Sequence, residues 1–158
     1  MDAGISGLQN LITGLHPPQL DDLGLLAALR WYSNQVSERS NLPVSIQSNG
    51  NDRWLPDDIR LVIFRIAQEA ITNTVRHASA SRIIVQLECT GSTIRMTIED
   101  DGCGFAVEQT LQDATRPHWG LLGMLERALL IQAGCQIIST PGKGTQVIVV
   151  WNGRKANG

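Results

Sequence analysis

A polar stripe along one predicted helix is the first feature whose residue types could do chemistry. Its four members carry a carboxylate, an amide, a guanidinium and an imidazole: Glu69, Asn73, Arg76 and His77. Because seven residues make nearly two helical turns, Glu69 continues the line of Val62 in an otherwise apolar stripe. Burying such groups without partners costs roughly 1–3 kcal/mol each, and more when they are charged. The stripe therefore faces either solvent at the rim of the core or a polar ligand.

An acidic, glycine-rich hexapeptide, residues 100–105 (DDGCGF), follows a predicted strand. By alternation with Ile98, Asp100 is expected to point toward the covered face of the sheet and Asp101 toward solvent. The two glycines, Gly102 and Gly104, would let the backbone approach a ligand closely. A carboxylate that enters the core needs a hydrogen-bond donor, and the exocyclic amine of adenine is one candidate. The alternative is a plain Asp/Gly turn.

A third candidate is the helix start at residues 120–124 (GLLGM), which follows a segment without periodicity, residues 106–119. A segment of that length in a compact domain is usually functional or mobile. A helix N-terminus presents free N–H groups and a positive partial charge, which suit a phosphate. Gly120 and Gly123 would let this backbone come close to a ligand, and helix packing explains them equally well.

Periodicity predicts the elements that must position these groups. The expected helices cover residues 2–15, 23–38, 56–77 and 121–133, and the expected strands cover residues 43–47, 82–89, 93–100, 136–140 and 145–151. Asp21 or Asp22 is expected to cap the second helix. The order ααβαββαββ predicts an α+β fold in two layers. Its mixed, mostly antiparallel sheet of about five strands would carry three helices on one face, with a further helix at the N-terminus.

The composition is typical of a soluble globular domain. The chain has 158 residues, of which 42% are hydrophobic and 18% charged. A net charge of −2 gives no sign of nucleic-acid binding. Cys89, Cys103 and Cys135 lack metal-ligand spacing and favour a reduced, cytoplasmic setting. No apolar run approaches the roughly 20 residues of a membrane helix, and no signal peptide is recognisable. Because the chain starts inside a helical pattern, we expect it to be a piece of something longer.

Taken in order, four segments resemble the nucleotide-binding domain of sensor histidine kinases, which has the Bergerat (GHKL) fold shared by gyrase, Hsp90 and MutL. Residues 64–78 are similar to the N box and residues 100–105 to the G1 box. Residues 118–127 resemble the G2 box of the NarL/DesK-type kinases, and residues 141–145 the closing glycine–threonine turn. Residues 15–25 (LHPPQLDDLGL) are similar to the join between dimerisation helix and catalytic domain in that subfamily.

The resemblance implies a site for ATP and Mg²⁺. Asn73 would be the metal ligand, Glu69 the catalytic glutamate of the N box, and Asp100 the acceptor for the adenine amine. In ATP-hydrolysing relatives the N-box glutamate activates water. Residues 105–119 would form a lid over the nucleotide. The other cofactor-binding residues implied are a basic pair near the phosphates, residues flanking the lid and a threonine near adenine: Arg76, His77, Gly102, Gly104, Gly120, Leu121, Gly123, Met124 and Thr145.

One feature of the kinases is missing. No His-Asp or His-Glu pair occurs that could act as phosphoacceptor with its base; the histidines are His16, His77 and His118. The resemblance therefore implies that residues 1–19 end a dimerisation helix and form a linker, that residues 20–152 form the ATP-binding catalytic domain, and that residues 153–158 are a disordered tail.

The phosphoryl group would pass from ATP to a histidine on the parent protein's own dimerisation domain, and from there to a response regulator of the NarL type. The resemblance implies a cytoplasmic, homodimeric parent, with or without a membrane anchor. The piece itself could be a monomer.

Two other classes of function stay open. A stand-alone GHKL ATPase or an anti-sigma-type serine kinase shares the fold. The gyrase-like ATPases, however, use a lysine from a following domain, and the anti-sigma kinases lack the LHPP-type join. The third class is a nucleotide-sensing or dimerisation module without chemistry, against which Glu69, Asn73 and Asp100 argue.

Overall fold

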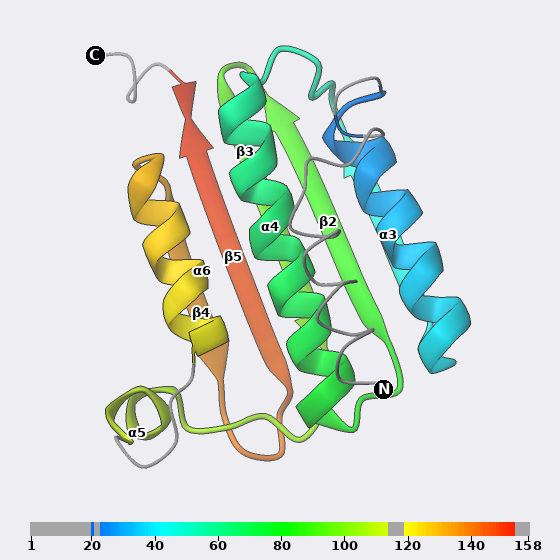
Figure 1. Ribbon diagram of the computed structural model, residues 1–158, viewed down its shortest axis with the longest axis vertical. Helices are drawn as coiled ribbons and strands as arrows, with labels where there is room; N and C mark the ends of the chain where they lie inside the picture. The colour runs from blue at the N-terminus through cyan, green and yellow to red at the C-terminus, as the bar shows by residue number, and fades with distance from the viewer. Residues whose placement is uncertain (1–19, 21–22, 114–118, 154–158) are drawn as a thin grey trace, which may run out of the picture.

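The computed structural model describes residues 20, 23–113 and 119–153, and the structural statements below refer to these residues. Within them, no helix is both long enough and apolar enough to cross a membrane. Three helices lie side by side on one face of a sheet (Figure 1): α3 (Leu25–Ser40), α4 (Asp57–Asn73) and α6 (Trp119–Leu130). A short helix, α5 (Val107–Gln112), lies at the end of the molecule where α6 begins.

The sheet has five strands in the order β1-β2-β3-β5-β4. Their bounds are β1 Val44–Asn49, β2 Ile83–Thr90, β3 Thr93–Asp100, β4 Gly134–Ser139 and β5 Thr145–Asn152. β1 runs parallel to β2, and the other three pairings are antiparallel. The predicted two-layer α+β sandwich, with a mixed, mostly antiparallel sheet and three helices on one face, is thereby confirmed. The expected N-terminal helix lies outside the described residues.

The core forms between the helices and the alternating inward positions of the strands. Ile94, Met96 and Ile98 of β3 are at most 2% exposed, whereas Arg95 and Glu99, on the opposite face of the strand, are exposed. Across from them, α4 buries Ile63 and Phe64 completely. Since each fully buried side chain of this size stabilises the fold by about 1.5–3 kcal/mol, this layer holds α4 firmly against β3.

The structure corrects the end of the helix predicted over residues 56–77. α4 ends at Asn73, and Thr74–Ala78 form a π-helical turn. Hydrogen bonds in a π turn span five residues instead of four, so a spacing of seven no longer returns a side chain to the same line. Arg76 and His77 therefore leave the line of Glu69 and Asn73, and both are exposed.

Two other predictions about helices were wrong. The segment 106–119 is not free of regular structure, because Val107–Gln112 form α5; none of its side chains is buried, so no apolar stripe predicts it. α6 ends at Leu130 and not at residue 133 as predicted. It cannot continue that far because Gln132 adopts a positive φ of 58°, which does not occur inside an α-helix.

Gly153 was predicted to begin the tail. It is buried and donates its N–H to the Ser92 carbonyl oxygen.

α3 is capped by a residue distant in sequence. Its N-cap position is Gly24, with φ 92° and no side-chain cap of its own. The Leu26 N–H instead donates to Asp52 Oδ2 at 2.7 Å, across a separation of 26 residues. A carboxylate at this position satisfies one of the free N–H groups of the first turn. The predicted caps, Asp21 and Asp22, lie outside the described residues, and α3 begins at Leu25 instead of residue 23.

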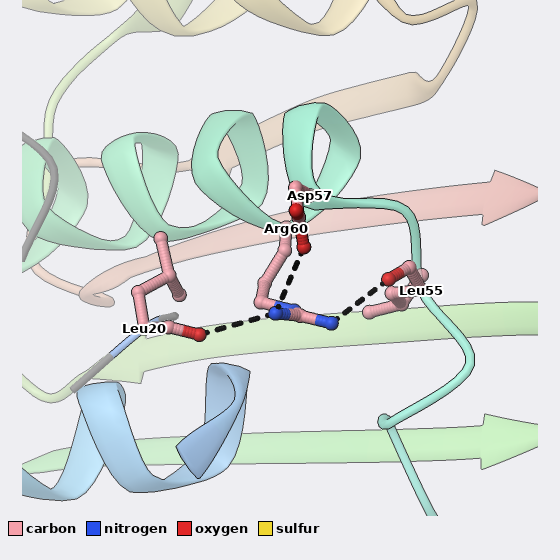
Figure 2. Close-up of polar contacts among 4 residues, drawn as sticks. All are labelled: Leu20, Leu55, Asp57 and Arg60. Atoms are coloured by element: carbon pink, nitrogen blue, oxygen red, sulfur yellow. Dashed lines mark hydrogen bonds and ion pairs between the residues drawn. The ribbon is translucent and has the colours of Figure 1, made fainter. Parts of the chain in front are cut away.

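A buried guanidinium joins the start of the domain to α4 (Figure 2). Arg60 is 8% exposed. It donates from Nη1 to the Leu20 carbonyl oxygen at 3.1 Å and from Nη2 to the Leu55 carbonyl oxygen at 2.9 Å. Nη1 also lies 3.2 Å from the exposed carboxylate of Asp57. The two carbonyl contacts attach Leu20, which is fully buried, to the first turn of α4.

We expect Arg60→Met to lower the free energy of unfolding by roughly 2–4 kcal/mol, because it leaves two buried carbonyl groups without donors. Asp57→Asn removes only the exposed ion pair and should cost at most about 1 kcal/mol. Urea denaturation of both variants measures the difference. Equal losses would mean that the exposed ion pair, and not the carbonyl contacts, accounts for the contribution of Arg60.

Candidate functional site

The end of α4 and the start of α6 lie at the same end of the sandwich (Figure 1), and they carry Glu69, Asn73 and Gly120 of the predicted site. Asp100 is the most enclosed of the acids there, at 7% exposed. Its Oδ1 accepts the Gly102 N–H at 2.8 Å, and its Oδ2 accepts the Thr74 hydroxyl at 2.9 Å. A carboxylate offers about four acceptor positions, so two remain for donors of a ligand. The prediction that Asp100 turns to the covered face is confirmed.

Asp101 takes the opposite role, as predicted from strand alternation. It is exposed, and its carboxylate accepts the hydroxyl and the N–H of Ser81 and the N–H of Arg82. The hydrogen bonds from Ser81, with a smaller contribution from Arg82, hold the pKa of the Asp101 carboxyl below its usual range. Its acceptor positions bind the loop before β2, so Asp101 shapes the backbone next to Asp100.

Three neighbouring strands, β3, β5 and β4, each place a polar residue in a row that begins at Asp100. Strand register pairs Asp100 with Thr145 and Thr145 with Ser139. The Ser139 hydroxyl lies 2.8 Å from Thr145 Oγ1 and 2.9 Å from the Gly144 carbonyl oxygen, and it accepts the Phe105 N–H at 2.9 Å. Thr145 is thus held next to Asp100, as the prediction of a shared adenine site requires.

Gly102 is needed because the hexapeptide lies directly against the π turn. A Cβ at residue 102 would collide with the carbonyl oxygen and Cβ of Ala78. The same carbonyl oxygen accepts the Cys103 N–H at 2.7 Å. Gly104 follows with a positive φ of 64°, next to the Thr140 carbonyl oxygen. The two glycines predicted to approach a ligand therefore also let the hexapeptide pack against its neighbours.

The start of α6 lies against the polar half of α4. A Cβ at Gly120 would collide with Glu69 Oε1 and lie 3.2 Å from Asn73 Oδ1. Of the two explanations of this glycine, the structure directly shows helix packing. Since a helix N-terminus carries a positive partial charge, the Glu69 carboxylate is favourably placed at the first turn of α6. Glu69 and Asn73, one turn apart on α4, therefore both lie against the first turn of α6.

The side-chain oxygens of Glu69 and Asn73 are suitable ligands for a magnesium ion. Mg²⁺ prefers oxygen ligands in octahedral geometry and usually keeps water and phosphate ligands beside one or two from the protein. Within the described ranges, no three His, Cys, Asp or Glu side chains gather as a metal site. The amide oxygen of Asn73 beside the Glu69 carboxylate therefore fits an ion that a nucleotide also binds, better than one enclosed by protein alone.

The other predicted binding residues lie around this pair. Arg76 and His77 are exposed on the π turn, and the His77 carbonyl oxygen accepts the Cys103 thiol at 3.4 Å. Leu121 is 8% exposed and Met124 1% exposed, both in the core cluster. Gly123 is covered by Arg127, whose Nη1 would lie 2.9 Å from a Cβ there. The nucleotide contacts predicted for these residues stay predictions.

Sequence reasoning missed three polar residues that hold the site together: Tyr32, Thr74 and Ser139. Thr74 lies four residues after the buried Ala70, and its N–H still bonds to the Ala70 carbonyl oxygen as in an α-helix, so the apolar stripe continued by one turn could have indicated its inward direction. Ser139 precedes the predicted glycine turn and has no distinctive local signal.

Cys103 is expected to be the only fast-reacting thiol of the three in the chain. Burial raises the pKa of both Cys135 and Cys89 to about 11, and the charge of Asp52 acts in the same direction on Cys89. Cys103 is exposed. Because the thiolate is the nucleophile, a disulfide reagent at pH 8 should modify one thiol rapidly and all three after unfolding. Loss of the fast phase in Cys103→Ser would verify the assignment, and its persistence would contradict it.

The sequence also matches known proteins. Residues 58–154 match the sequence model of a protein family, the histidine kinase-, DNA gyrase B- and HSP90-like ATPases. The signal transduction histidine-protein kinase/phosphatase DegS of Brevibacillus brevis is 31% identical over 147 residues, covering 93% of this chain and 37% of that protein. The oxygen sensor histidine kinase NreB of Staphylococcus carnosus is 33% identical over 143 residues, covering 90% and 40%. The chain thus spans less than half the length of these relatives.

Solved structures share the fold. The histidine kinase domain of the blue-light activated histidine kinase EL346 from Erythrobacter litoralis superposes with a TM-score of 0.66 at 22% identity, over 84% of this chain and 62% of that one. The mycobacterial sensor histidine kinase MprB gives a TM-score of 0.61 at 12% identity, over 81% and 93%. Together with the sequence matches, these findings confirm the resemblance predicted from the four motifs.

Proposed function

Because the chain belongs to the histidine kinase-, DNA gyrase B- and HSP90-like ATPase family, we propose that it is the ATP-binding catalytic domain of a two-component sensor histidine kinase. One observation carries the proposal. The buried acceptor Asp100 and the oxygen pair of Glu69 and Asn73 lie at the same end of the sandwich, on either side of the π turn. A nucleotide has a base with an amine at one end and phosphates at the other, and this arrangement suits both.

Adenine would be held at the Asp100 end. The exocyclic amine donates to the carboxylate, whose orientation the Thr74 hydroxyl and the Gly102 N–H already hold. Thr145, opposite Asp100 in the strand register, would assist directly or through water. Because the site of Asp100 is buried, it favours a ligand that brings its own hydrogen-bond donor.

The phosphates would lie toward the start of α6 and the π turn. Asn73 would contribute its amide oxygen to Mg²⁺, and Glu69 would orient a water in the shell of the ion. When bound, the ion supplies positive charge that neutralises the phosphate oxygens. Gly120 lets the first turn of α6 lie directly against Glu69 and Asn73. The exposed Arg76 would offer positive charge to the phosphates, and the exposed His77 would offer a hydrogen-bond donor. Catalysis of this kind relies mainly on positioning and charge.

The acceptor of the γ-phosphate would be a histidine on a dimerisation domain of the same parent protein. We propose a response regulator of the NarL type as the next recipient, because the join at residues 15–25 and the G2 box resemble that subfamily. The parent protein would act as a homodimer with its catalytic domain in the cytoplasm.

The test supplies the missing histidine. The purified chain is incubated with γ-labelled ATP, Mg²⁺ and the dimerisation domain of the Bacillus subtilis DegS protein, a relative 33% identical over 136 residues. Label that appears on the added domain and is lost in acid but stable in base indicates phosphohistidine. Omitting the added domain and replacing its acceptor histidine with glutamine are the controls.

The outcomes separate the alternatives. Steady phosphate release that depends on Glu69, without labelled protein, would favour a stand-alone ATPase. Acid-stable label on a serine would favour a kinase of the anti-sigma type. ATP binding without any transfer, also when a dimerisation domain from a second relative is offered, would favour a nucleotide-sensing module.

A further inference from the structure

Tyr32 links α3 to the last turn of α4, one residue before Asn73. Its hydroxyl oxygen lies 2.9 Å from Thr72 Oγ1. Its ring meets the buried ring of Phe64 edge-on, with centroids 6.1 Å apart and an angle of 77° between the ring planes. Phe64 lies two turns before Thr72 on the same helix. Tyr32 is therefore anchored by its ring and reaches along α4 with its hydroxyl.

The turn that Tyr32 contacts lies directly before a change in helix type. After Asn73 the helix changes from α to π, a rare geometry that is found mostly at functional sites. Thr72 is β-branched, which makes it a poor helix former, and threonine hydroxyls in helices commonly bond to the preceding turn of their own backbone. Here the Thr72 hydroxyl pairs with a side chain of another helix. α3 thereby restrains the turn that carries Asn73.

Charged side chains of the candidate site influence the pKa of the Tyr32 hydroxyl. Burial raises the pKa of Tyr32 above its ordinary value, and the hydrogen bond with Thr72 opposes that effect. The charge of Glu69 raises the pKa further, whereas the charges of Arg76 and Arg39 lower it. The hydroxyl therefore lies within the electrostatic field of the polar half of α4, although its hydrogen bond is to the uncharged Thr72.

We propose that Tyr32 is a positioning residue for the metal-dependent part of nucleotide binding, because its hydrogen bond to Thr72 holds the turn from which Asn73 reaches the metal. This inference rests on the proposed function. Tyr32 would act through Thr72, its hydrogen-bond partner, and not on the nucleotide itself. It also does not hold Asp100, whose partners are Thr74 and Gly102. Its removal should therefore separate the two halves of the site.

The test is Tyr32→Phe, which keeps the ring against Phe64 and removes only the hydroxyl. Isothermal titration should show affinity for Mg²⁺-ATP lowered about fivefold, the size of one net hydrogen bond. Affinity for ADP in the presence of a chelator should stay within about twofold, which is less than one such bond accounts for. Thr72→Val should reproduce the loss, Thr72→Ser should restore binding, and Tyr32→Phe combined with Thr72→Val should lose no more than either alone.

The matched control is Trp31→Phe, a change at the neighbouring and more exposed position of α3, which should leave both affinities unchanged. A second readout uses the fact that Tyr32 is the only tyrosine in the chain. The fluorine resonance of incorporated 3-fluorotyrosine should shift more with Mg²⁺-ATP than with metal-free ADP.

Each outcome decides the question. Equal losses of metal-dependent and metal-free affinity in Tyr32→Phe would show a merely structural role and overturn the proposal, as would no loss of either. A fluorine resonance that does not shift when Mg²⁺-ATP is added would also overturn the proposal. Failure of the unsubstituted chain to bind any nucleotide would overturn the proposed function as well, and this result is recognisable before any variant is compared.

Discussion

Replacing Asp100 with alanine is expected to lower the affinity for ATP by about 10- to 100-fold, with or without Mg²⁺. The carboxylate is the proposed acceptor for the adenine amine, and a hydrogen bond to a charged group contributes roughly 1.5–3 kcal/mol. The variant also leaves the Gly102 N–H without its acceptor and leaves the Thr74 hydroxyl only the Ala70 carbonyl oxygen, at 3.2 Å, so the site loses fixed hydrogen bonds along with its charge. Titration of ATP and ADP by calorimetry measures the effect.

Asp101→Asn is the matched control for Asp100. It changes an adjacent carboxylate of the same type, but one that is exposed and bound to the loop at Ser81. We expect its affinity for ATP to stay within about threefold of the unsubstituted chain, a change of less than 1 kcal/mol. Undiminished affinity in Asp100→Ala would exclude the assignment of Asp100 to adenine, and a loss of equal size in both variants would point to a general effect on the hexapeptide.

Asn73→Ala is expected to abolish the stimulation of ATP binding by Mg²⁺ and to reduce phosphoryl transfer to a supplied histidine by at least about 100-fold. A metal ion that neutralises phosphate oxygens contributes several kcal/mol to the transition state, and each 1.36 kcal/mol is a factor of about ten in rate. Binding of ADP in a chelator should persist, since Asp100 keeps its partners.

The contrast between these two variants tests the division of the site. Asp100→Ala should lose binding under all conditions, whereas Asn73→Ala should lose only the metal-dependent part. Asn73→Asp, which keeps an oxygen ligand, should retain more activity than Asn73→Ala. Full Mg²⁺ stimulation in Asn73→Ala would contradict the metal assignment and leave the adenine assignment standing.

Much of the fold could be predicted because its periodicities are local. Strict alternation over residues 93–100 places Ile94, Met96 and Ile98 on the covered face, and β3 has these bounds in the structure. The same alternation separates the buried Asp100 from the exposed Asp101. The helical stripe that begins at residue 59 likewise gave the apolar face of α4. In each case the direction of a side chain follows from its own neighbours in the chain.

The partners of these residues could not be predicted in the same way. The Thr74 hydroxyl meets Asp100 across 26 residues, and the Ser139 hydroxyl meets the Phe105 N–H across 34. Such contacts depend on strand register and on the depth to which a helix packs. Neither property leaves a pattern within a short window of sequence.

Periodicity and residue order along the chain were enough to predict the faces of the helices and strands, the buried direction of Asp100 and the order of the four motifs. The stripe of Glu69, Asn73, Arg76 and His77, in contrast, is divided in the folded molecule in a way that no local pattern indicates. The π turn removes Arg76 and His77 from the line, while the close approach of Gly120 places the first turn of α6 against Glu69 and Asn73. Both effects arise from the fit of α4 against α6 and the hexapeptide, which are distant in the chain and adjacent only after folding.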